Sequence, residues 1–202
     1  MFVIGLTGGP GVGKTEVAKI LRKHKAIIIS GDDTGREIID KNPAVLKKLV
    51  TIISDDILLP NKKLNRKKLG SLVFGNYENM RKLNEIIHPP LLKSLKAKIK
   101  TNRDKHPKRI IVVDAALIFE WGIANWFDYI LVVTARRDIR LKRLTQNGLS
   151  IRQANARIAS QILQRTKEKL ADFVIENNGT KNSLINKTFK FLTALKSIGS
   201  DR

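Results

Sequence analysis

The residues best placed to do chemistry form a glycine-rich segment, residues 8–15, with the sequence GGPGVGKT. It fits the pattern G-x-x-x-x-G-K-[ST], whose glycines let backbone N–H groups wrap around polyphosphate oxygens. The lysine can reach the β- and γ-phosphates of ATP, and the hydroxyl after it can ligate Mg²⁺. We therefore predict ATP contacts at Gly8, Gly11, Val12, Gly13, Lys14, Thr15 and Glu16, with Lys14 also catalytic and Thr15 a metal ligand.

The segments on either side of this loop support that prediction. Residues 2–6 (FVIGL) are typical of a short buried strand, and residues 16–21 (EVAKIL) have the spacing of an amphipathic helix. The helix N-terminus adds partial positive charge where the phosphates would bind. A glycine-rich turn with an accidental Lys-Thr is the alternative, and the order of strand, loop and helix argues against it.

Two carboxylates are expected at the same edge of a sheet as this loop. Asp32 follows one buried run and Asp114 ends another, and ligands of open parallel sheets gather at the carboxyl ends of the strands. Asp32 could orient and deprotonate an acceptor hydroxyl, although it or Asp33 could instead cap the following helix. Asp114 ends a strand like that of a Walker B motif and could hold Mg²⁺, with a purely structural role left open.

Four arginines form the next chemical cluster, at positions 136, 137, 140 and 143. Arginines in a mobile lid can close on phosphates and exclude water that would otherwise hydrolyse ATP. The alternative is that most of them are solvated helix charges. We expect one or two to act on phosphate, Arg143 first.

The elements that must position these residues follow an α/β pattern. Continuous β-branched runs, rather than alternating ones, are typical of parallel strands buried on both faces. We predict the fold of a P-loop NTPase, a parallel five-stranded sheet flanked by helices. The expected strands are residues 1–6, 26–30, 109–114, 129–134 and 173–175, and the clearest helices are residues 14–24 and 182–196.

Two helical stretches interrupt this pattern. Residues 43–108 have apolar residues at helical spacing, and we expect a helical acceptor-binding insertion in which His88, followed by Pro89, marks a helix start. Residues 135–169 are the expected lid. The nucleotide-binding core is then formed by residues 1–42, 109–134 and 170–202.

Composition and charge limit the class of protein. The chain of 202 residues has no cysteine, which excludes disulfides, Cys-ligated zinc and thiol catalysis. No apolar run approaches the roughly 20 residues of a membrane span, and the first strand leaves no room for a signal peptide, so we expect a cytoplasmic protein.

The net charge of +21 favours binding to polyanions. RNA is one candidate, but residues 41–109 hold 18 Lys and Arg against 5 Asp and Glu with a single Tyr and a single Phe, so stacking platforms are missing. We predict no obligate nucleic-acid or membrane partner.

Taken in order, several short motifs resemble the dephospho-CoA kinase family across nearly the whole chain. They are GLTGGPGVGKT at 5–15, IISGD at 28–32 with Arg36, LNR at 64–66 with Leu69 and VF at 73–74, IHP at 87–89, Asp114 with LIFE at 117–120, Arg143, Gln161, and ADFVIEN at 171–177. Several positions depart from the family pattern: Pro10 and Val12 in the loop, Ser30 and Gly31 before Asp32, Ala116, Arg140 in place of Gln, and Asn147 in place of Arg.

The resemblance implies ATP-dependent phosphorylation of the ribose 3′-hydroxyl of dephospho-CoA, the last step of coenzyme A biosynthesis, with Mg²⁺ required. ATP and dephospho-CoA would be the partners. It implies that Asp32 is the base, Arg143 a lid contact to phosphate, Asn177 a neighbour of the adenine, and Arg36, Arg66, His88 and Pro89 acceptor-binding residues. The alternatives are another P-loop nucleoside or nucleotide kinase, and a basic P-loop NTPase that binds RNA.

Overall fold

The computed structural model describes residues 1–74 and 76–200, and the chain divides into two compact units. The first contains residues 1–30 and 99–202, and the second contains residues 31–98. The second unit therefore begins earlier and ends earlier than the helical insertion expected at residues 43–108.

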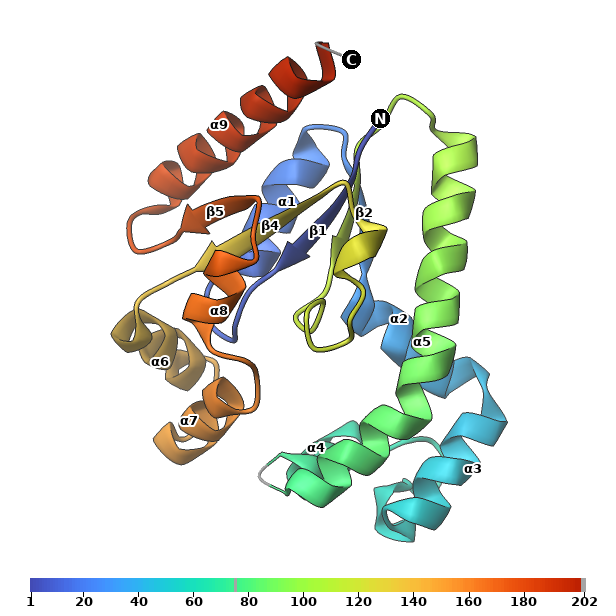
Figure 1. Cartoon of the computed structure of the whole chain (residues 1–202). Helices are drawn as coiled ribbons and strands as arrows, with labels where there is room; N and C mark the ends of the chain where they lie inside the picture. The colour runs from blue at the N-terminus through green and yellow to red at the C-terminus, as the bar shows by residue number, and fades with distance from the viewer. Residues whose placement is uncertain (75, 201–202) are drawn as a thin grey trace. The chain divides into compact units, whose positions relative to one another are not determined.

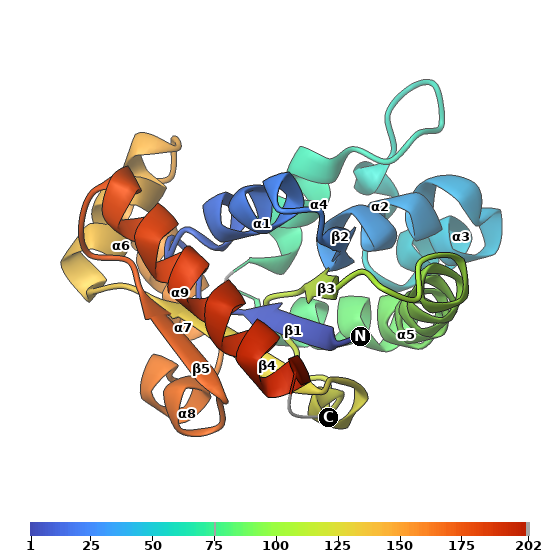
Figure 2. The ribbon, with the colours of Figure 1, turned by 90° about the horizontal axis from the view of Figure 1, so that it is seen from above.

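The first unit is built on a five-stranded sheet of order β2-β3-β1-β4-β5, and every neighbouring pair is parallel (Figure 1, and Figure 2 with all five strands labelled). The predicted parallel five-stranded sheet is confirmed, with strand ends that shift by one or two residues. The strands are β1 Val3–Thr7, β2 Ile27–Ser30, β3 Ile111–Asp114, β4 Tyr129–Thr134 and β5 Phe173–Glu176.

Burial on both faces explains why these strands are continuous apolar runs. One face, with Leu6 and Val133, belongs to a core that α1 and α9 complete, and Figure 2 shows these two helices side by side. On the other face, a Cβ added to Gly5 would lie 2.8 Å from Phe127 and 2.9 Å from Ile118, so the segment after β3 packs there. The helices of this unit are α1 Lys14–Lys23, α6 Arg137–Gln146, α7 Ile151–Ala159, α8 Gln164–Lys169, α9 Lys181–Ser200 and the short 3-10 helix Ala124–Trp126.

The second unit is helical, as expected, and has an apolar core of its own. Its elements are α2 Gly31–Lys41, α3 Pro43–Ile52, the 3-10 helix Asp55–Ile57, α4 Arg66–Val73 and most of α5 Tyr77–Lys105. Residues such as Leu49, Ile57 and Val73 are almost completely buried and form the centre of that core.

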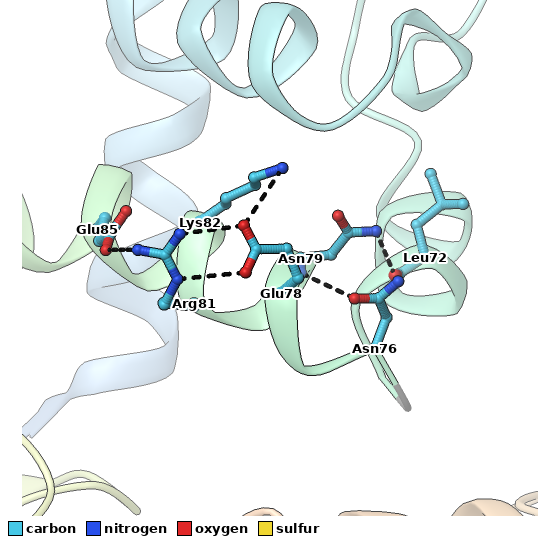
Figure 3. A network of polar contacts seen from close by, with 7 residues as sticks. All are labelled: Leu72, Asn76, Glu78, Asn79, Arg81, Lys82 and Glu85. Atoms are coloured by element: carbon cyan, nitrogen blue, oxygen red, sulfur yellow. Dashed lines mark hydrogen bonds and ion pairs between the residues drawn. The ribbon is translucent and has the colours of Figure 1, made fainter.

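The helix start predicted at His88 and Pro89 is wrong, because both residues lie inside the continuous helix α5. Prolines remove backbone donors and bend helices, and the ribbon of α5 changes direction along its length (Figure 1). The helix begins instead near Asn76, whose side-chain oxygen accepts from the backbone N–H of Asn79 at 3.0 Å (Figure 3).

The first turns of α5 also neutralise part of the charge of the second unit. Arg81 pairs with Glu78 at 3.0 Å and with Glu85 at 2.5 Å, and Lys82 lies 3.5 Å from Glu78 (Figure 3). The Arg81 hydrogen bond lowers the pKa of the Glu78 carboxyl. These exposed pairs stabilise the helix little, but they show that some of its basic residues have local partners. In the part of the chain that the structure describes, no helix is long and apolar enough to span a membrane.

Candidate active site

The glycine-rich loop connects the carboxyl end of β1 to the first residue of α1, Lys14, as predicted. Gly13 has a φ of 94°, and a Cβ there would lie 2.3 Å from the side-chain nitrogen of Asn177. Gly11 has a φ of 75°, and a Cβ there would lie 2.8 Å from the backbone oxygen of Arg140. Both positions therefore require glycine for conformation and for space.

Lys14 and Asp114 meet at the carboxyl edge of the sheet. The Lys14 Nζ lies 2.5 Å from Asp114 Oδ1, and the two side chains are 15% and 14% exposed. The strand register explains this meeting, because Asp114 is aligned with Leu6, the next-to-last residue of β1. The expected proximity of the loop and Asp114 is thus present within the first unit, while the metal-binding role of Asp114 remains a prediction.

The first turn of α1 carries two further predicted ATP contacts. Thr15 is exposed, and Glu16 is half-buried. Lys19 donates to Glu16 Oε1 at 2.7 Å, and this hydrogen bond lowers the pKa of the Glu16 carboxyl. Among the described residues, no group of three or more His, Cys, Asp or Glu side chains could hold a metal ion. A metal at this loop would therefore depend on phosphate oxygens and water as well as on protein oxygens.

Arg143 and Asn177 brace the loop through its carbonyl groups. The Arg143 guanidinium donates to the carbonyls of Gly11 and Val12, each at 3.2 Å, and to the carbonyl of Asn177 at 3.1 Å. The buried Asn177 side chain donates to the same Val12 carbonyl at 2.8 Å. The loop, the start of the predicted lid and the segment after β5 are thereby tied together around Val12.

The four arginines of the cluster divide into two pairs. Arg140 is buried and donates through Nε to the Pro10 carbonyl at 2.9 Å, while burial and the neighbouring Arg137 lower its pKa. Arg136 and Arg137 are exposed, paired with Asp138 at 2.7 Å and with Asn155 at 2.7 Å respectively. Arg140 and Arg143 therefore contact the glycine-rich loop, whereas the other two lie on the surface.

The predicted acceptor-binding residues all lie in the second unit. Arg66 pairs with Asp40 at 2.6 Å, and Arg36 lies 3.7 Å from Asp33. His88 and Pro89 are in α5, where burial lowers the pKa of the His88 imidazole.

Asp32 lies in the first turn of α2, which begins at Gly31 directly after β2. The idea that Asp32 or Asp33 is the residue capping this helix is therefore wrong, since both are inside it. Carboxylates in a first turn still interact favourably with the helix N-terminus.

Sequence reasoning missed Lys167, which is buried in α8 and contacts Ala116, Glu120 and Gln161. Both Gln161 and Glu120, which lies in the LIFE segment, belong to the short motifs described for the sequence. No local pattern distinguishes Lys167 from the other lysines of its helix, because two of its partners are far away along the chain.

The parallel sheet, the glycine-rich loop between β1 and α1, and the lysine held against a strand-ending aspartate define a P-loop kinase fold. A shikimate kinase of Bacteroides thetaiotaomicron shares this fold, with a TM-score of 0.52 and 14% identity over 96% of this chain and 98% of that one.

More specific similarities place the chain within this class. A family model for dephospho-CoA kinase matches residues 2–183. A dephospho-CoA kinase of Geobacillus kaustophilus is 37% identical over 89% of this chain and 90% of that protein. The structure of a dephospho-CoA kinase from Campylobacter jejuni matches with a TM-score of 0.72 and 27% identity, covering 98% of each chain. The chain belongs to the dephospho-CoA kinase family.

Proposed function

We propose that this protein transfers the γ-phosphoryl group of ATP to the ribose 3′-hydroxyl of dephospho-CoA, giving CoA and ADP. The observation that carries the proposal is the loop of residues 8–13, which ends at a lysine held against Asp114, in a chain of this family. Phosphoryl transfer requires positioning and charge stabilisation more than covalent chemistry, and this loop is suited to both.

The loop and Lys14 would bind the triphosphate. Backbone N–H groups at the start of α1 and the Lys14 ammonium present positive charge to the β- and γ-phosphates, where negative charge develops during transfer. The hydrogen bonds from Arg143 and Asn177 to the Val12 carbonyl hold the loop in place. Its amides would therefore need little rearrangement when phosphate binds.

Thr15 and Asp114 fit a magnesium ion bound together with ATP. Both offer oxygen ligands, which Mg²⁺ prefers, and Mg²⁺ commonly takes one or two protein ligands plus phosphates and water. When bound, Mg²⁺ would neutralise charge on the β- and γ-phosphate oxygens. Lys14, at 2.5 Å from Asp114, would share that task.

Asp32 is the proposed base. Ser30, the last residue of β2, is aligned with Asp114, and Asp32 follows two residues further along the chain. This connection brings the chain to the carboxyl edge of the sheet immediately before Asp32. The Asp32 carboxylate would orient the 3′-hydroxyl of dephospho-CoA and accept its proton as the new bond to phosphorus forms.

The second unit would bind the acceptor. It carries Arg36, Arg66, His88 and Pro89 and has an excess of lysine and arginine, which suits the diphosphate of dephospho-CoA. A cytoplasmic location is part of the same proposal, because no apolar run of the sequence approaches the roughly 20 residues of a membrane span.

A substrate panel tests this function. ADP release should be measured with dephospho-CoA, nucleosides and nucleoside monophosphates, and dephospho-CoA should give the highest kcat/KM. Faster turnover of a nucleoside or its monophosphate would favour another P-loop kinase. RNA binding that depends strongly on salt, with little acceptor-dependent ATP turnover, would instead favour an RNA-binding NTPase.

A further inference from the structure

Lys167 carries a buried charge that the proposed function does not use. Its side chain is 1% exposed, and its ammonium lies 2.6 Å from the Ala116 carbonyl, 3.0 Å from Glu120 Oε1 and 3.2 Å from Gln161 Oε1. These three acceptors match the three donors of an ammonium group. The charge is therefore paired and hydrogen-bonded, which burial of a lysine requires.

The Ala116 carbonyl lies near the ends of two strands, β1 and β3. It also accepts from the Thr7 hydroxyl at 3.1 Å, and Thr7 is the last residue of β1 before the phosphate-binding loop. Ala116 itself follows Asp114 by two residues. Lys167 thus bonds to a junction between the strand that leads into the loop and the strand that carries Asp114.

Glu120 and Gln164 fix the rest of the same region. Glu120 Oε1 also accepts from the backbone N–H of Ile162 at 3.1 Å, so one carboxylate binds both Lys167 and the segment between α7 and α8. Gln164, at the start of α8, accepts from Arg140 at 3.3 Å, and Arg140 contacts the Pro10 carbonyl. Helix α8 is therefore bonded to its surroundings at two separate residues, Lys167 and Gln164.

The electrostatic environment of Lys167 is costly. Burial lowers the pKa of its ammonium, the Glu120 hydrogen bond opposes that shift, and the charges of Lys14 and Arg140 lower the pKa further. A buried ion pair is often no more stabilising than apolar packing of the same volume, and repulsion from nearby cations adds to its cost. A charge kept at this position therefore points to a role other than stability alone.

We propose that Lys167 is a positioning residue that fixes residues 160–169 against the carboxyl ends of β1 and β3 and so keeps water away from the phosphoryl group. The inference rests on the proposed function. With this segment in place, the acceptor hydroxyl is the nucleophile that reaches the γ-phosphate. With the segment loosened, water competes for the γ-phosphate and ATP gives ADP and inorganic phosphate.

The test compares Lys167→Met with Lys169→Met, an exposed lysine of the same helix. ADP and phosphorylated acceptor should be counted in the same reaction. We expect one ADP per product for the wild type and for Lys169→Met. For Lys167→Met we expect kcat to fall at least tenfold, with a smaller rise in the KM for ATP and several ADP released per product. A kcat and an ADP-to-product ratio equal to those of Lys169→Met would overturn the proposal.

A second variant and a second measurement keep the test decisive. If Lys167→Met melts below the assay temperature, Glu120→Gln removes the charge but keeps an oxygen for the Ile162 N–H. An unchanged ADP-to-product ratio in Glu120→Gln would then overturn the proposal.

Amide hydrogen exchange can be measured without the acceptor substrate. Exchange in residues 160–169 should rise at least tenfold in Lys167→Met but not in Lys169→Met. Failure of the wild type to phosphorylate dephospho-CoA would contradict the proposed function, while the exchange result would still decide whether Lys167 fixes residues 160–169.

Discussion

The Lys14 ammonium and the Asp114 carboxylate lie 2.5 Å apart, which joins the start of α1 to the end of β3 through two mostly buried charges. Each charge compensates the other, so the removal of one leaves the other poorly solvated. The pair also holds the lysine at the edge of the sheet where the loop opens. The fold thus positions Lys14 beside the glycine-rich loop.

Lys14→Met should lower kcat/KM for phosphoryl transfer by at least about 100-fold, or roughly 3 kcal/mol. The substitution removes the positive charge that we propose stabilises the γ-phosphoryl group during transfer. The matched control is Lys19→Met. Lys19 lies on the same helix and forms an exposed ion pair with Glu16. Steady-state kinetics with ATP and dephospho-CoA would measure both variants. Similar losses in the two would show that Lys14 has no special role.

Asp32→Asn should depress kcat far more than it changes the KM for ATP, because a base acts only as the acceptor proton leaves. Asp33→Asn is the control, since both residues lie in the first turn of α2. The two variants should be compared in kcat and in ATP affinity. A near-normal kcat for Asp32→Asn would refute the assignment and make Asp114 the next candidate.

Arg66→Ala should raise the KM for dephospho-CoA with little effect on the KM for ATP, because Arg66 lies in the second unit, which we propose binds the acceptor. The structure provides a control, because Arg66 pairs with Asp40 at 2.6 Å. Asp40→Asn breaks the ion pair but keeps the arginine, and it should leave the KM for dephospho-CoA nearly unchanged. If Arg66→Ala raises both KM values equally, the second unit is not the acceptor-binding part of the protein.

Neutralisation of the exposed residues Lys62 and Lys63 together should alter mainly the salt dependence of the reaction. Their fields are screened beyond roughly 8–10 Å at physiological ionic strength. Measurement of kcat/KM for dephospho-CoA across a salt series would separate this effect from that of Arg66. A loss of acceptor affinity that persists at high salt would mean that these lysines contact the substrate directly.

Arg140→Gln should raise the KM for ATP about tenfold, near the lower end of the value of a hydrogen bond to a charged group. Glutamine is the residue that the resemblance to the family leads us to expect at this position. Its side chain is too short to contact both Pro10 and Gln164 as Arg140 does. Arg137→Gln, an exposed neighbour bonded to Asn155, is the control. Equal ATP affinity in the two variants would show that the bond to Pro10 does not shape the loop.

The sheet and the conformation of the glycine-rich loop could be predicted because their signals are local. Strands buried on both faces must be apolar throughout, and the loop needs glycine where Gly11 and Gly13 have positive φ. The position of Asp114 followed from topology, since parallel strands end at one edge of the sheet. These features required no knowledge of distant contacts.

Two features of the structure could not be predicted, because tertiary contacts decide them. The His88-Pro89-Pro90 sequence suggests a helix boundary, yet α5 continues through it, and the buried Leu91 and Leu95 just beyond anchor the helix by packing. Lys167 reads as one more surface lysine, and only the fold brings it to Ala116 and Glu120, 51 and 47 residues away in the sequence.

The most direct test of the central claim is to identify the product made from ATP and dephospho-CoA by the purified chain. ³¹P NMR of the product should show a new phosphomonoester on the ribose 3′-oxygen, formed in step with ADP and abolished when Mg²⁺ is chelated. A product phosphorylated elsewhere, or release of ADP and inorganic phosphate without phosphorylated dephospho-CoA, would contradict the account.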